Sequence, residues 1–263
     1  MVGRTADQRV SVPALEAAWL TLTFVHWPVR PGAVRALLPP GLAVDEWRGS
    51  AWVSLAAFVM ADMRPLGLGS PPEASRRADR VVRVLHEVSS SPETNVRTYV
   101  RGPDGRDGIW FFSLDIGART LAATLRGVSG APYHHGRLSV EPNHDAITYA
   151  GSRQGGEPSY RAVVRPGDLL EPSELDTWLT GRWRAYTTHL GRLLVFPVEH
   201  EPWPLQSARL DLLEENLLGH AGLPEPGEAP LVHYSEGVRK VRLGFPRLCR
   251  FRPRRPTARS PWA

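Results

Sequence analysis

The chain is expected to fold as a mainly β protein of the α+β class, an antiparallel cone or barrel with a few short helices. Apolar residues alternate with polar ones in many short runs, which is typical of strands with one buried face. Turn-forming residues separate these runs, so the strands follow one another as hairpins. Because few helical segments interrupt the hairpins, we expect a sheet that curls or closes on itself.

Residues 1–246 are expected to form a single domain. With 263 residues, 42% of them hydrophobic, the chain can bury one full core, and no internal repeat or linker divides it. The segment 247–263 differs, because it holds six arginines and no acidic residue. Without it, 26 basic side chains (32 minus 6) face 27 acidic ones, so the body is close to neutral. We expect a basic, disordered tail at 247–263.

The composition also narrows the location and the partners of the protein. No apolar run reaches the roughly 20 residues of a membrane-spanning helix, and Glu16 interrupts the only segment resembling a signal peptide. The single cysteine, Cys249, excludes an intramolecular disulfide and favours a cytoplasmic protein. The body has no basic stripe interleaved with aromatic residues, so neither nucleic acid nor a membrane is an expected partner. A homo-oligomer is compatible with the sequence.

The N-terminal half is predicted to contain strands and one short helix. Alternating apolar residues indicate a strand over 14–27. Pro31 then begins a short helix that ends before Pro39-Pro40-Gly41. A long loop rich in Pro, Gly, Ser and Arg is predicted at 64–79, and it either borders the mouth of a site or is a plain surface connection. Further strands are predicted at 42–46, 51–60 and 81–88.

The C-terminal half is predicted to contain helices among the strands of a meander. The segment 118–128 has apolar residues at helical spacing, and Gly130 ends it. A second helix is expected to begin near Pro172 and to run toward Trp183. The acidic stretch at 212–218 is also expected to be helical. Further strands are predicted at 132–140, 146–153, 160–164, 193–200, 231–235 and 238–245.

The clearest hairpin joins 92–101 to 108–115 through a turn rich in Gly, Pro and Asp. Side chains alternate across a strand, so Val96 and Thr98 share one face with Val100. The opposite face is richer in polar groups: Glu93, Asn95, Arg97, Tyr99 and Arg101. This face is either a wet outer surface or the lining of a pocket. Likewise, Glu93 and Arg97 form either a structural ion pair or parts of a site. In a site, an apolar wall of Trp110 and Phe112 beside the carboxyl group would raise its pKa, and the arginine would hold a substrate carboxylate.

Motifs for metal, nucleotide and hydrolase chemistry are missing from the sequence. It has no His-Glu-x-x-His, no cysteine pair, no Gly-x-Ser-x-Gly and no Gly-x-x-x-x-Gly-Lys. His134 and His135 are adjacent, so on a strand they face opposite ways and cannot chelate one metal ion. Covalent catalysis by an amine has one candidate, because Lys240 is the only lysine. We therefore expect neither a metal nor another cofactor.

Several blocks together resemble a bacterial family of unknown function, the YqjF-like family, domain of unknown function 2071. The resemblance runs from about residue 20 to residue 246, and the blocks keep one order. The seven blocks are Val25-His26-Trp27, Leu37-Leu38-Pro39-Pro40-Gly41-Leu42, Pro92-Glu93 with Asn95-Val96-Arg97-Thr98-Tyr99-Val100, Trp110-Phe111-Phe112-Ser113-Leu114-Asp115, Pro132-Tyr133-His134, Trp203-Pro204-Leu205-Gln206 and His233-Tyr234-Ser235.

That family is distantly similar to acetoacetate decarboxylase, which implies a cone-like antiparallel barrel with an internal pocket. The local similarity is a helix followed by a glycine and then by Pro132-Tyr133-His134, at the position where the decarboxylase carries Pro-Lys-Lys. There the first lysine forms a Schiff base, and its cationic neighbour lowers the lysine pKa. Tyr133 has no amine, so the resemblance implies that this route is lost. Glu93 matches the acidic pocket residue of the decarboxylase by its order along the chain.

Two hypotheses for function follow. In the first, the protein is an enzyme that acts on a small organic acid or carbonyl compound by acid/base chemistry, as a lyase, hydratase or isomerase. In the second, it is a binding module that keeps the pocket without the chemistry. Tyr186, His200, Gln206 and His233 are expected to be packing or capping groups. The predicted catalytic residues are Glu93, Tyr133 and His134, and the predicted substrate-binding residues are Asn95, Arg97, Trp110, His135 and Arg153.

Overall fold

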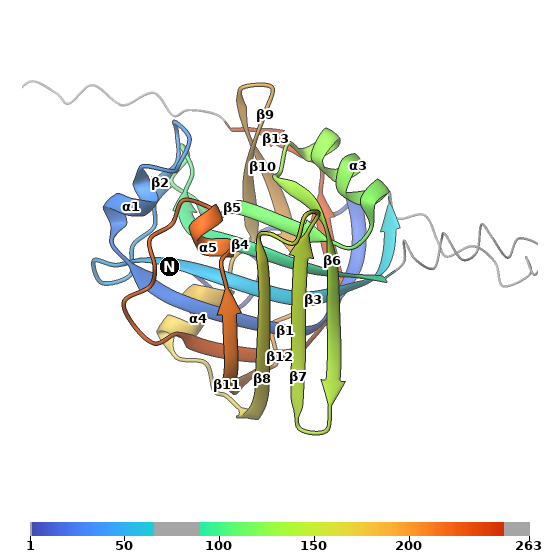
Figure 1. Ribbon diagram of the computed structural model, residues 1–263. Helices are drawn as coiled ribbons and strands as arrows, with labels where there is room; N and C mark the ends of the chain where they lie inside the picture. The colour runs from blue at the N-terminus through green and yellow to red at the C-terminus, as the bar shows by residue number, and fades with distance from the viewer. Residues whose placement is uncertain (1, 66–89, 250–263) are drawn as a thin grey trace, which may run out of the picture.

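The computed structural model describes residues 2–65 and 90–249 of the chain (Figure 1). The predicted strand at 81–88 and nearly all of the predicted loop at 64–79 lie outside the described residues. Most of the predicted tail also lies outside them. The first residues of that tail, β13 (Arg247–Leu248), pair with strand β10 and so join the sheet.

One sheet holds the described strands together. Its order is β13-β10-β9-β5-β6-β7-β8-β11-β12-β1-β3-β4-β2, and β4 also pairs with β5. This last pairing closes a nine-stranded barrel that runs from β5 through β6–β8, β11, β12, β1 and β3 to β4, which confirms the predicted barrel. The other strands are β1 (Pro13–Val29), β2 (Ala43–Val44), β3 (Ala51–Pro65), β4 (Ser90–Arg101), β5 (Asp107–Ile116), β6 (Tyr133–Asn143), β7 (Ala146–Arg153), β8 (Ser159–Leu169), β9 (Arg184–His189), β10 (Arg192–Glu199), β11 (Leu205–Glu215) and β12 (Leu231–Gly244).

A second ring shares five strands with this barrel. Strand β9 pairs with β5, and β10 pairs with β12, so β9 and β10 bridge the shared strands β5, β4, β3, β1 and β12. In Figure 1, β6, β7, β8 and β11 cross the front while β1, β3 and β12 pass behind them. The shared strands therefore have a buried face on each side, and this is why both faces of β4 are largely buried.

The two sides of the shared strands have separate hydrophobic cores. Inside the nine-stranded barrel, Val25 and Val96 pack in a cluster that also contains Tyr149 from β7. On the other side, Phe24 and Phe58 pack in a cluster with Trp203. Because neighbours along β1 such as Phe24 and Val25 enter different cores, the alternation of side chains is what divides the interior into two compartments.

Local sequence signals mark the beginning of two helices and the end of a third. Helix α1 (Pro31–Arg35) has proline in its first turn, and α3 (Arg119–Ser129) ends at Gly130, which has φ of 68°. Helix α4 (Glu174–Thr180) starts with a capping box in which Ser173 and Asp176 bond each other's backbone N–H. It ends at Thr180, before Trp183, because β9 begins at Arg184. No helix of the described residues is long and apolar enough to cross a membrane.

The structure corrects the prediction of an acidic helix at 212–218. Most of that stretch belongs to β11, which pairs with β8 from Gln206 to Glu215, and only α5 (Leu217–His220) is helical. Acidic and leucine-rich sequences suit helices, but here the sheet supplies partners for the backbone and the tertiary context prevails. The meander of β6, β7 and β8 has the predicted order, and the two predicted strands at 231–245 form one strand, β12. Two pairs, β5–β6 and β5–β9, are parallel within the mainly antiparallel sheet.

Candidate active site

Polar side chains of β4 line the compartment between the shared strands and the β9–β10 bridge. Arg97 lies over the ring of Phe24 from β1, with 4.8 Å between the guanidinium carbon and the ring centroid. The hydroxyl of Tyr99 lies 3.0 Å from Nδ1 of His26, also on β1. We call this set of side chains the interior polar face; it comprises Glu93, Asn95, Arg97, Tyr99, His26 and His233. Glu93, Asn95 and Tyr99 are buried, so this face of β4 is not a wet outer surface, and its role as the lining of a pocket stays a prediction.

Glu93 is the carboxyl group of this face, and it is only 3% exposed. Its neighbours on the adjacent strands are Phe58 and Ile116, both apolar. Burial raises the pKa of Glu93 to about 8, the charge of Asp115 adds to the effect, and a hydrogen bond with the Asn95 side chain opposes it. One carboxyl oxygen, Oε2, has no hydrogen-bond partner among the described residues. With this pKa, the Glu93 carboxyl group can exchange a proton near neutral pH.

Tyr133 lies close enough to Glu93 for the charge of Glu93 to act on its phenol. The chain leaves α3 through Gly130 and enters β6 at Tyr133, which is level with Leu114 of β5 because these strands are parallel. Burial raises the pKa of Tyr133 well above its usual value, and the charge of Glu93 raises it further. The phenol is thus neutral at physiological pH and can donate a hydrogen bond or a proton.

Arg97 is the cation of the interior polar face. Burial lowers its pKa. No carboxylate pairs with it among residues 2–65 and 90–249, and its Nε has no hydrogen-bond partner there. The structural ion pair considered between Glu93 and Arg97 is not formed. A buried guanidinium without an anion is suited to bind the carboxylate of a ligand.

His134 and Arg153, two other predicted site residues, lie near Asp115 instead. Arg153 binds both oxygens of Asp115, at 2.6 Å from Nε and 3.2 Å from Nη2. Asp115 is level with His134 on the neighbouring strand. Burial and the charge of Arg153 lower the pKa of His134, while Asp115 opposes them. The charge of Arg153 is already neutralised, so this arginine is less available to a ligand than Arg97.

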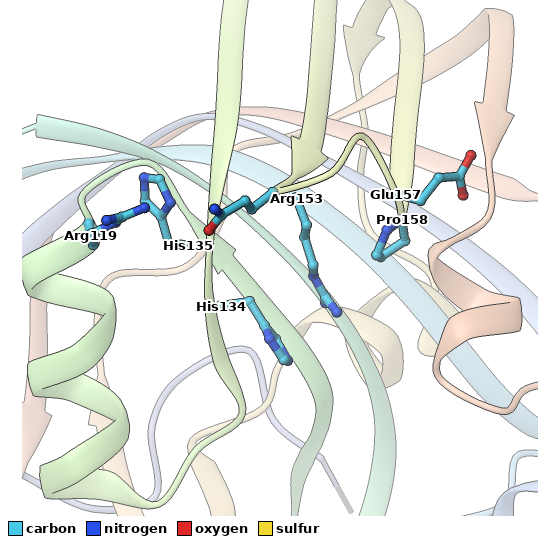
Figure 2. A pocket seen from close by; sticks show the side chains of 7 residues that line it. Arg119, His134, His135, Arg153, Glu157 and Pro158 are labelled. Carbon is cyan, nitrogen blue, oxygen red and sulfur yellow. The ribbon is translucent and has the colours of Figure 1, made fainter.

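His135 belongs to a cleft at the surface. The cleft has a volume of about 710 Å³ and is lined by Arg119, His134, His135, Arg153, Gln154, Glu157 and Pro158. Figure 2 shows the ring of His135 beside Arg119, whereas His134 is directed toward the end of the Arg153 side chain. The two histidines therefore diverge, in keeping with the alternation of a strand. No group of three metal-ligating side chains is present in the described part of the chain.

Trp110 does not form the predicted apolar wall beside Glu93. It packs with Tyr186 and Leu193 in a separate cluster. Phe112, the other predicted wall residue, packs against the core of the nine-stranded barrel. The pairing of β4 with β5 shifts register by one residue at this point. Alternation together with this bulge directs Trp110 and Phe112 away from Glu93.

Three residues that matter to the geometry are missing from the predicted site. His26 is fully buried between Tyr99 and His233. Asp115 binds the cleft residue Arg153, and its charge also raises the pKa of Glu93. His233, expected to be a packing or capping group, lies in the interior polar face. These residues could have been found from the sequence as polar side chains at predicted buried positions of apolar strands, because buried polar groups need hydrogen-bond partners.

Comparison with known proteins places the chain in a family. The family model DUF2071, described as an uncharacterized conserved protein, matches residues 16–239. The chain belongs to the DUF2071 family. This DUF2071 protein is also 32% identical over 244 residues to the uncharacterized protein YqjF of Bacillus subtilis strain 168, and the match covers 90% of this chain and 95% of YqjF. The resemblance found in the seven sequence blocks is confirmed.

Solved structures share the fold of this DUF2071 protein. The enduracididine biosynthesis enzyme MppR, complexed with pyruvate, matches with a TM-score of 0.59 at 15% identity, over 93% of each chain. Acetoacetate decarboxylase from Legionella pneumophila matches with a TM-score of 0.58 at 13% identity, over 92% of this chain and 90% of that one. At such identities the likeness shows the fold alone. It confirms the predicted acetoacetate-decarboxylase-like barrel.

Proposed function

We propose that the protein is an enzyme that moves protons on a small organic acid with a carbonyl group, without a Schiff base. One observation carries this proposal: a carboxyl group with a pKa of about 8, Glu93, shares a buried face with an arginine that has no anionic partner among the described residues, Arg97. Enzymes achieve acid/base catalysis with groups whose pKa lies near the working pH. Structural carboxylates, by contrast, are ordinarily paired and ionised.

Arg97 is the proposed anchor for the ligand carboxylate. Its guanidinium lies over Phe24 of β1. Phe24 pairs with Ala56 of β3, and Ala56 pairs with Asn95 of β4, so these three residues are at the same level of the sheet. Asn95 is two residues from Glu93, which corresponds to roughly 7 Å along a strand. A short-chain acid bound at Arg97 can therefore extend past Asn95 toward Glu93. The orphaned Oδ1 of Asn95 is available to accept a hydrogen bond from such a ligand.

Glu93 and Tyr133 are the proposed proton-transfer pair. Protonated Glu93 can donate to a carbonyl oxygen, and ionised Glu93 can remove a proton from the adjacent carbon. Tyr133 remains a neutral donor that stabilises charge developing on the same oxygen. His134, His135, Arg153 and Trp110 are left out of this mechanism because they lie in the cleft, near Asp115 or in another cluster.

Two further observations support the proposal. The only lysine, Lys240, is exposed on β12, so it does not supply a buried amine for a Schiff base. MppR, which has the same fold, is complexed with pyruvate in its solved structure, so a barrel of this kind can hold a small keto acid. A non-catalytic binding module is the alternative, because the amine at the Tyr133 position is missing.

The test combines ligand binding with turnover. Pyruvate, acetoacetate and other short keto acids are screened by thermal shift against the wild type, Arg97→Ala and Glu93→Gln. We expect a keto acid at one hundred times its Kd to stabilise the wild type by about 2.7 kcal/mol. Arg97→Ala should abolish this stabilisation. Glu93→Gln should keep it, while loss of the general acid/base should reduce turnover by about 10² to 10⁴.

Matched controls separate the site from general effects of substitution. Arg161→Ala on β8 and Glu141→Gln on β6 change exposed residues of the same types, and both should behave as the wild type. If keto acids stabilise Arg97→Ala as well as the wild type, the anchor is wrong. Turnover that survives in Glu93→Gln would exclude Glu93 as the acid/base group, and binding without any turnover in the wild type would favour the binding module.

A further inference from the structure

Two buried histidines of the interior polar face each have one ring nitrogen bonded and one orphaned. His26 and His233 are 0% and 1% exposed, and their ring centroids are 5.4 Å apart with an interplanar angle of 66°. Nδ1 of His26 lies 3.0 Å from the Tyr99 hydroxyl, and Nε2 of His233 lies 2.9 Å from Oδ1 of Asp176. The remaining nitrogens, Nε2 of His26 and Nδ1 of His233, have no hydrogen-bond partner among the described residues.

The proton positions on His233 follow from its partner. Asp176 accepts the Ser173 backbone N–H in the capping box of α4, and these bonds, with His233 itself, hold the pKa of Asp176 below its usual value. An ionised carboxylate can only accept, so Nε2 of His233 carries the hydrogen. Burial lowers the pKa of His233, so the ring is neutral and Nδ1 has a free lone pair. His233 thus presents a basic nitrogen whose orientation Asp176 fixes.

The proton positions on His26 follow from Tyr99. Burial raises the pKa of the Tyr99 phenol, so it keeps its hydrogen. Arg97 lies beside this hydroxyl and has only donors. Ser54 is also near it, but Oγ of Ser54 makes no hydrogen bond among the described residues, which leaves Nδ1 of His26 as the acceptor for the phenol hydrogen. Burial, His233 and Arg97 all lower the pKa of His26, so its ring is neutral too. Its single hydrogen is therefore on Nε2, as an unused donor.

We propose that Nε2–H of His26 and Nδ1 of His233 together bind one hydroxyl group, and that the ligand is a small hydroxy acid whose carboxylate is held by Arg97. A hydroxyl is the group that fits, because it accepts one hydrogen bond and donates another. A water molecule supplies the same chemistry when no acid is bound. The ligand class rests on the proposed function, since it uses the same arginine.

The pair also fixes the orientation of the hydroxyl. The hydroxyl donates its hydrogen bond to Nδ1 of His233. The carboxylate of Asp176 holds that ring in the Nε2–H tautomer, as in other Asp–His pairs. His26 and Tyr99 hold the oxygen end of the hydroxyl and act as positioning residues for its orientation.

Binding experiments with matched acids test the proposal. The affinities of lactate and propionate, and of 3-hydroxybutyrate and butyrate, are measured by calorimetry for the wild type, His233→Phe and His26→Phe. In the wild type we expect at least one hydroxy acid to bind about tenfold more tightly than its deoxy analogue, the effect of one or two buried hydrogen bonds. In both variants this preference should fall below about twofold while propionate and butyrate bind as before. His220→Phe, at an exposed position of α5, is the control and should keep the preference.

A second measurement on the wild type does not depend on the folding of variants. Nitrogen-15 NMR of labelled histidine should show His233 as the neutral Nε2–H tautomer, with Nδ1 hydrogen-bonded by water before acid is added. Titration with the preferred hydroxy acid should change the Nδ1 shift, and an unchanged shift identifies water as the bound hydroxyl. A proton on Nδ1 of His233, or a direct coupling between the two ring nitrogens, would overturn the proposal.

The outcomes distinguish this inference from the proposed function. If hydroxy and deoxy acids bind equally and Arg97→Ala weakens both, the anion anchor stands and the hydroxyl site is overturned. If neither these acids nor the keto acids bind the wild type, the anchor fails and the hydroxy acid fails with it. If only the keto acids bind, the anchor stands and the hydroxy acid is overturned.

Discussion

The interior polar face and the region of the surface cleft each contain an arginine and a carboxyl group. Within the described residues, the two groups are paired beside the cleft and unpaired on the interior polar face. Arg153 of the cleft pairs with the buried Asp115 through two hydrogen bonds, so their charges neutralise each other. On the interior polar face, Arg97 and Glu93 have no such pairing, and burial shifts the pKa of both toward the neutral form. A paired group contributes to stability, whereas an orphaned buried group costs stability and is available to a ligand. The ion pair therefore stabilises the fold, and the interior polar face is the region for which we propose ligand binding.

The largest expected effect is on the pH dependence of stability. Glu93 has a pKa of about 8 when folded and 4.5 as a model value. The folded state therefore holds an extra proton between these values, so the contribution of Glu93 to stability is complete below pH 4.5 and is lost as the pH rises to about 8. The difference corresponds to at most roughly 4 to 5 kcal/mol. Glu93→Gln should remove this loss, so the variant should be the more stable protein at pH 8.5 by chemical denaturation.

Glu141→Gln on the exposed part of β6 is the control for this prediction, and its pH profile should match the wild type. A Glu93→Gln profile that declines between pH 5 and 8 as steeply as the wild type would show that Glu93 is ionised in the folded protein. The distinction between the two regions would then lose its electrostatic basis.

The next effect compares the two arginines directly. Arg153→Met leaves Asp115 buried without its cation, so we expect a loss of about 2 to 3 kcal/mol in the free energy of unfolding. Arg97→Met removes a cation whose burial is uncompensated among the described residues, so stability should stay the same or rise by up to about 1 kcal/mol. Denaturant unfolding of both variants at pH 7 measures the difference. A greater loss for Arg97→Met would indicate an anionic partner for Arg97 and would contradict its role as a free anchor.

The smallest effect is expected at the rim of the cleft. Arg119 is exposed and makes no ion pair among the described residues, and His135 lies beside it (Figure 2). Arg119→Ala and His135→Ala should each change stability by less than about 0.5 kcal/mol. Neither should alter the binding of keto acids if the ligand site is the interior polar face. Weaker binding in either variant, measured by the same thermal shifts, would move the site to the cleft.

Local sequence signals were sufficient for most of the elements. The turn-formers between β4 and β5 predicted the hairpin, and Gly130 marked the end of α3 because it adopts a left-handed conformation there. Local signals failed at β11, where an acidic, leucine-rich stretch was expected to be helical. Its backbone hydrogen bonds go to β8 and β12, which a local pattern does not register. The division into a domain and a tail at residue 246 stays a prediction.

The candidate site was predicted in part, and the reason is geometric. Strand alternation places Glu93, Asn95, Arg97 and Tyr99 on one face of β4 whatever surrounds the strand. Whether that face is wet or dry depends on the β9–β10 bridge and on α4, which come from distant parts of the chain. The same long-range pairings bring His26 and His233 together and turn Trp110 away. Residue order and local chemistry thus define which side chains share a face, whereas burial, pairing and pKa arise only when the closed sheet removes water from that face.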